Sequence, residues 1–151
     1  MNTLTKPKTA LEAFSLIKEN AKRMPAPRDC STLKVGEVCR QGDIYILRLD
    51  KIENRGAEVK SRQLAPGVSN GSRHIVAENP KVRLYKCVPD LSRLEKLWGL
   101  KLVPLQIGPA IEAKEVWSLT HPSHPFCNQF AAGTYLTIYQ MDFATKQRAL
   151  D

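Results

Sequence analysis

The sequence predicts a mainly β fold, a small antiparallel barrel or sandwich of about six or seven strands. Three observations support this fold class. Short runs rich in β-branched and aromatic residues recur about every ten residues, glycine and proline turns separate them, and helical periodicity is confined to two places. The 151 residues suit one domain, with an N-terminal helix and linker at 1–28, a β-domain at 29–145 and a polar tail at 146–151.

The N-terminal helix is expected between Thr9 and Met24. Thr9 and Glu12 form a capping box, and Pro25 ends the helical pattern. Apolar residues recur at spacings of three and four, which gives one apolar stripe: Leu11, Phe14, Ile17, Ala21 and Met24. This stripe has two interpretations. It docks on the β-domain that follows, or it docks on another subunit.

The strands of the β-domain follow from alternating patterns between turn residues. Asp50–Gly56 is expected to close a hairpin, Gly108–Pro109 to form a turn, and the chain from Asp142 to be a polar tail. The expected strands, in order, cover residues 44–49, 57–65, 72–77, 82–88, 110–119 and 134–141.

A second, shorter helix interrupts the strands. Leu91, Leu94, Leu97 and Trp98 recur at helical spacing, and Gly99 is expected to end the helix. Such an insertion covers a sheet edge, closes the end of a barrel, or binds a partner through Trp98.

The cysteines and the apolar residues indicate a cytoplasmic protein. No two of Cys30, Cys39, Cys87 and Cys127 form a Cys-x-x-Cys pair, so we expect separate buried thiols and no zinc site. The chain lacks both a signal-peptide pattern at its N-terminus and an apolar run long enough to cross a membrane. No complete cofactor motif is present, so no cofactor is expected.

Positive charge is unevenly distributed along the chain. The formal net charge is +8, and residues 1–28 carry six Lys or Arg against two Glu. Residues 73–101 carry seven basic and three acidic residues, whereas residues 102–151 carry three basic and four acidic ones. A clustered surplus attracts polyanions such as nucleic acid, although it is also typical of a basic surface that only keeps a protein soluble.

The middle of the chain holds the candidate nucleic-acid-binding residues. Strand alternation places a cation beside an aromatic ring on one face of residues 82–88, an arrangement that stacks bases and neutralises phosphates. The candidates are Arg73, His74, Lys81, Arg83, Tyr85 and Lys86. The alternative is an ordinary polar outer face.

The histidines are the candidate metal ligands. His121 and His124 are three residues apart, and His74 is the possible third ligand. The two prolines of this segment oppose a helical arrangement, so the alternative is that the imidazoles stabilise a loop. Cys127, close to His124, is a possible nucleophile, but the sequence identifies no base for it.

Three functions are consistent with these patterns. The leading one is a non-catalytic basic β-domain that binds nucleic acid or a nucleoprotein partner. The second is a structural or assembly protein, as found in phages and mobile elements, that oligomerises through the N-terminal helix and the insertion around Trp98. The third is a metal-dependent enzyme built on His74, His121 and His124.

Overall fold

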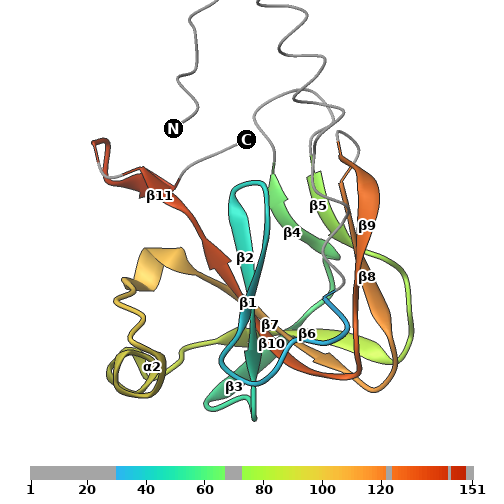
Figure 1. Ribbon diagram of the computed structural model, residues 1–151, viewed down its shortest axis with the longest axis horizontal. Helices are drawn as coiled ribbons and strands as arrows, with labels where there is room; N and C mark the ends of the chain where they lie inside the picture. The colour runs from blue at the N-terminus through green and yellow to red at the C-terminus, as the bar shows by residue number, and fades with distance from the viewer. Residues whose placement is uncertain (1–29, 67–72, 122–123, 143, 149–151) are drawn as a thin grey trace, which may run out of the picture.

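The computed structural model describes residues 30–66, 73–121, 124–142 and 144–148, and it confirms a mainly β fold with one short helix (Figure 1). The strands of this described part form two main sheets, and neither sheet closes into a barrel. The predicted helix between Thr9 and Met24 lies outside the described residues.

The larger sheet is antiparallel and has six strands in the order β1-β2-β10-β7-β6-β3. Its strands are β1 Val38–Gln41, β2 Ile44–Leu49, β10 Gly133–Tyr139, β7 Ile107–Ala113, β6 Val82–Cys87 and β3 Arg55–Val59. The smaller sheet has the order β4-β5-β8-β9. Its strands are β4 Gln63–Pro66, β5 Arg73–Val76, β8 Trp117–His121 and β9 His124–Phe130.

The central strand β10 has both faces buried, because a different layer covers each side of the six-stranded sheet. Tyr135 and Tyr139 face the core shared with the four-stranded sheet. Leu136 and Ile138 face a second core that helix α2, Leu91–Trp98, completes. Figure 1 accordingly shows α2 and the four-stranded sheet on opposite sides of the six-stranded sheet. This alternation was predicted, and the structure confirms it.

Helix α2 begins and ends where the sequence predicts. The Asp90 side chain accepts a hydrogen bond from the Arg93 amide at 3.1 Å, and Gly99 ends the helix in the left-handed conformation with φ 68°. The helix buries Leu94 against the six-stranded sheet, and the short 3₁₀ turn η1, Pro104–Gln106, leads into β7.

No helix among the described residues is long and apolar enough to cross a membrane.

The predicted hairpin around Asp50–Gly56 is wrong. Strand β3 pairs with β6 rather than with β2, and β4 pairs with β5 in the other sheet. The expected strand 57–65 is therefore two strands that belong to different sheets. Arg62 lies where the chain passes from β3 in one sheet to β4 in the other. Its guanidinium donates to the carbonyls of Val82 and Asn79 at 2.8 and 2.9 Å, and these hydrogen bonds fix the connection between the two sheets.

The prediction for residues 108–119 also needs correction. Gly108 and Pro109 lie inside strand β7, and the expected single strand is divided between β7 and β8. A Cβ atom at Gly108 would lie 2.8 Å from Cζ of Tyr139. Glycine is required here by the close approach of an aromatic ring and not by a turn.

Two further features differ from expectation. Cys30 and Cys39 form a disulfide rather than two separate thiols, and Cys87 is free. The residues after Tyr139 form a small hairpin, β11 Met141–Asp142 with β12 Gln147–Arg148, where we expected a polar tail from Asp142 onward.

Candidate functional site

The predicted nucleic-acid-binding residues do not form one continuous surface. Arg73, Lys81, Arg83 and Lys86 are exposed, as expected. The two ring-bearing members of the set are buried: His74 is 1% exposed and Tyr85 is 8% exposed. The four cations of the predicted set therefore lie at the surface, and its two rings lie in the interior.

Acidic side chains lie beside several of these cations. Arg83 lies 3.9 Å from the carboxylate of Glu58, and Lys81 forms an ion pair with Glu115. Two of the four exposed cations of the predicted set, Lys81 and Arg83, therefore lie beside carboxylates.

Tyr85 is unavailable for base stacking. The Arg55 guanidinium lies over its ring at 4.6 Å, and the same guanidinium pairs with Glu112 at 3.0 Å. A cation–π contact of this kind covers the face that a base would need. Tyr85 therefore packs beneath Arg55 on the sheet instead of presenting its ring to solvent.

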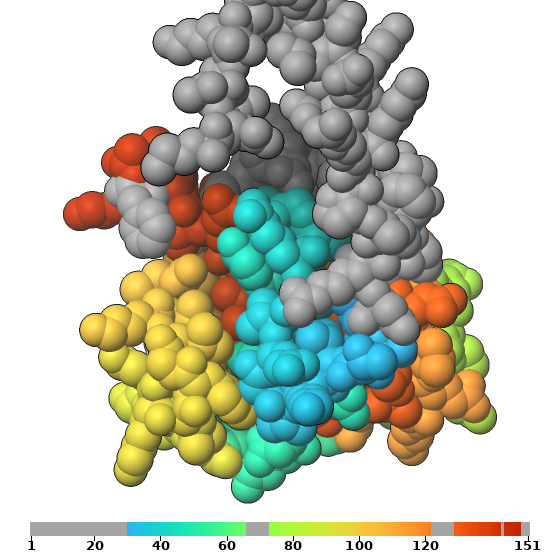
Figure 2. All heavy atoms as spheres, viewed as in Figure 1, coloured from blue at the N-terminus to red at the C-terminus, as the bar shows by residue number. Residues whose placement is uncertain are grey.

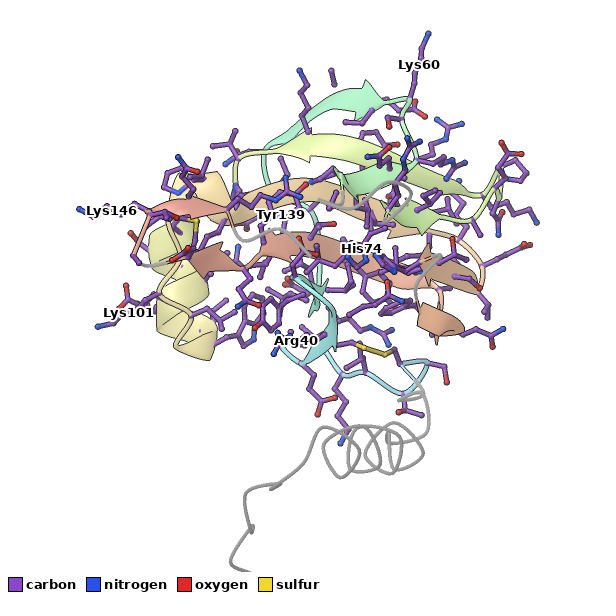
Figure 3. All side chains as sticks on the ribbon, turned by 90° about the horizontal axis from the view of Figure 1, so that it is seen from above. Arg40, Lys60, His74, Lys101, Tyr139 and Lys146 are labelled. Atoms are coloured by element: carbon purple, nitrogen blue, oxygen red, sulfur yellow. A yellow bond between two sulfur atoms is a disulfide. The ribbon has the colours of Figure 1, made fainter. Side chains whose placement is uncertain are left out.

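His74 belongs instead to a buried polar cluster between the two sheets. Its Nδ1 atom lies 3.0 Å from Oε1 of Gln41, and its Nε2 atom lies 2.8 Å from Oδ1 of Asp43. All three side chains are at most 7% exposed. Gln41 and Asp43 flank the turn between β1 and β2, so the cluster joins the six-stranded sheet to β5 of the other sheet (Figure 3).

Both ring nitrogens of His74 have oxygen partners in this cluster. The amide nitrogen of Gln41 points to the carbonyl of Leu119 at 3.5 Å, which leaves the amide oxygen to face His74. The opposite ring nitrogen faces a carboxyl oxygen of Asp43. The cluster is thus a buried polar hydrogen-bond network.

The structure brings two of the three candidate metal ligands together. The rings of His74 and His121 have centroids 4.4 Å apart, and His121 is the cross-strand partner of His124. Both nitrogens of His74 nevertheless already face oxygen atoms, so this ring offers no free ligand atom. Among the described side chains, which exclude that of His124, no group of three His, Cys, Asp or Glu is placed to hold a metal ion.

A third region, which sequence analysis treated mainly as a helix, exposes apolar side chains. We call residues 87–107, which contain α2 and η1, the insert. Four of the six large apolar side chains that are exposed in the described part of the chain belong to it: Val88 at 76%, Leu97 at 52%, Val103 at 47% and Leu105 at 56%. We call these four the insert surface. Figure 2 shows the region around α2 as a lobe at one side of the molecule.

The insert also borders the hollows of the described surface. One hollow of about 140 Å³ lies between Val88, Leu91 and Pro104. A larger groove of about 390 Å³ lies between the six-stranded sheet and Leu100 and Leu102. Burial raises the pKa of the Cys87 thiol, which lines the smaller hollow. The insert therefore combines apolar projections with apolar recesses.

The sequence did not indicate the buried cluster, because nothing local marks a histidine 31 residues away from Asp43 as its partner. It indicated the insertion around Trp98 as a possible contact, but not which of its apolar side chains are exposed. Leu97 was assigned to the buried stripe of the helix, yet it projects outward while Leu94 packs inward. The presence of apolar residues on both sides of a short helix was the available signal.

The comparisons with known proteins identify no relative. Neither protein-family models, nor curated proteins, nor solved structures contain a match to this chain.

Proposed function

We propose that this protein is a non-catalytic assembly protein, and that its insert surface binds a second copy of the same chain. The supporting observation is the concentration of exposed apolar side chains in the insert. Exposed apolar side chains that gather in one segment of the chain favour a protein interface over contact with water. We take a second copy as the occupant because two copies can bring the same apolar side chains together around a two-fold axis and so form a closed contact.

The test is the oligomeric state of the full chain by size-exclusion chromatography with light scattering. We expect the wild-type protein to form dimers or larger species as its concentration rises. Val88→Asp combined with Leu105→Asp should shift it to the monomer and weaken association at least about tenfold, which corresponds to ~1.4 kcal/mol. A wild-type protein that stays monomeric at every concentration contradicts the proposal.

Val116→Asp is the matched control, because Val116 is 58% exposed but lies between β7 and β8, outside the insert. It introduces the same charge at a similarly exposed valine and should leave association unchanged. If it dissociates the protein as strongly as the insert variants, the added charge and not the insert surface is responsible.

Nucleic-acid binding is the second candidate function, and a specific observation favours it. Besides the net charge of +8, several exposed cations have no ion pair within the described part of the chain, among them Lys60, Arg73, Lys86 and Lys114. Figure 3 shows Lys60 projecting away from the molecule. Unpaired cations release counterions when they contact phosphates.

A titration with single-stranded and duplex nucleic acid over a range of salt concentrations tests this candidate. Arg73→Ala with Lys86→Ala should weaken binding and reduce the slope against log salt by roughly one unit for each phosphate that the variant no longer neutralises. Arg83→Ala is the control, because its side chain already lies beside Glu58. Binding that does not depend on salt contradicts this function.

A further inference from the structure

The larger groove beside the insert has apolar walls. Its volume is about 390 Å³, and its lining includes Val38, Tyr45, Leu100, Leu102, Ile138 and Met141. Two glutamines complete the lining. Gln106 donates to the Tyr139 carbonyl at 3.3 Å and accepts from the Val103 amide at 3.1 Å, and the Gln140 oxygen accepts from Arg40 at 3.0 Å. These hydrogen bonds engage both ends of the Gln106 amide and the oxygen of Gln140, and the rest of the lining is apolar or aromatic, so the groove suits an apolar occupant.

The described chain begins close to the strand that forms one wall of this groove. Cys30 forms an isolated bridge with Phe130 and a disulfide with Cys39 of β1. The neighbour of Cys39 in that strand is Val38, which lines the groove. Because β1 is an edge strand of the six-stranded sheet, a chain leaving Cys30 can pass around this edge to reach the groove.

The segment that precedes Cys30 carries the matching chemistry. The sequence predicts a helix over Thr9–Met24 with one apolar stripe, and about 16 helical residues extend about 24 Å. Five residues, Pro25 to Asp29, connect this helix to Cys30, and an extended chain of that length reaches about 17 Å. The segment therefore carries an apolar stripe, and a short connection joins it to Cys30, which is bonded to the strand whose Val38 lines the groove.

We propose that the N-terminal segment Thr9–Met24 docks in the groove of its own chain, with Phe14 and Ile17 as the apolar anchors. A five-residue connection gives the segment a high effective concentration at its own groove, which favours this arrangement over docking on another copy. The proposal is independent of the assembly function, because the groove and the four side chains of the insert surface are formed by different residues.

A photocrosslinking experiment on the full chain tests the proposal. With p-benzoylphenylalanine in place of Phe14, irradiation should crosslink position 14 to residues 100–106 or 138–141, and mass spectrometry of the digest identifies the site. The product should migrate as a monomer on a denaturing gel. The same photoreactive residue in place of Glu19, which lies about 140° away from Phe14 around the predicted helix, should give at least about fivefold less of this crosslink, because residues five apart point to different faces.

Two other results would overturn the proposal. A crosslink that appears only in a dimer band would show that the occupant comes from a second copy, and crosslinks spread over the whole chain would show that the segment does not dock. Leu102→Glu, a change in the groove wall, should reduce the crosslink while the β-sheet circular dichroism remains unchanged. An unchanged crosslink in this variant also contradicts the proposed site.

Discussion

Two regions of this molecule hold side chains opposite in polarity to their surroundings. Between the sheets, a histidine and a carboxyl group lie in the interior, where His74 and Asp43 are 1% and 3% exposed. On the insert, Val88 and Leu105 are more than half exposed to water. The first region is polar inside an apolar core, and the second is apolar on a polar surface.

The two regions differ in whether other groups of the protein compensate for the unfavourable environment of their side chains. His74 faces an oxygen atom at each ring nitrogen, so its burial is compensated within the chain. The insert surface has no such compensation, because its side chains remain in contact with water. We therefore expect the buried cluster to contribute to stability, and we propose a binding role for the exposed side chains. The substitutions below test this division, beginning with the largest expected effect.

His74→Ala should cause the largest loss of stability. It removes the ring that faces both Asp43 and Gln41 and leaves a cavity between the sheets, so we expect the free energy of unfolding to fall by about 3–5 kcal/mol. Urea denaturation followed by circular dichroism measures this change. Asp43→Asn retains an acceptor oxygen and should cost less. A loss below about 1 kcal/mol for His74→Ala would mean that the cluster is not a structural link.

Removal of the Cys30–Cys39 disulfide should have the next largest effect. The bridge spans nine residues of sequence, and a loop of this size stabilises the folded state by about 2.5 kcal/mol through the entropy of the unfolded chain. The comparison is between the wild type and Cys30→Ser with Cys39→Ser, both measured without reductant. If adding a reductant destabilises the double variant as much as the wild type, the effect does not come from this bridge.

Gly36→Ala tests how the insert is attached to the sheets. Gly36 has φ +87°, and a Cβ atom there would lie 2.3 Å from Nε1 of Trp98, so the ring must move. Gly99→Ala is a matched control, because Gly99 also has positive φ but no other atom within 4 Å. We expect about 1 kcal/mol of backbone strain for Gly99→Ala and roughly twice that for Gly36→Ala. Only the Gly36 variant should change the tryptophan fluorescence.

Val88→Asp should have the smallest effect on stability and thereby sharpen the comparison. Val88 is 76% exposed, so its substitution should change the free energy of unfolding by less than about 0.5 kcal/mol, measured at a concentration where the protein is monomeric. A loss similar to that of His74→Ala would show that the insert surface belongs to the core of the fold instead of to an interface.

The sequence by itself determined those features that depend on near neighbours. Asp90 and Gly99 mark both ends of α2 because caps act within one helical turn. Strand β10 follows from the alternation of Tyr135, Leu136 and their neighbours, and the mainly β class follows from many such runs. The positive φ of Gly133, 153°, is likewise a local property, because glycine adopts this conformation more readily than other residues.

Only the tertiary structure decided which strands pair and which polar groups meet. The alternation of residues 55–59 is the same whether they pair with β2 or with β6. The sequence pattern of this segment therefore could not decide between the predicted hairpin and the observed pairing. Asp43 and His74 are 31 residues apart, and the histidine meets the carboxyl group only because two sheets pack face to face. The exposure of Val88 is also a tertiary property, because it depends on which surface the other elements leave uncovered.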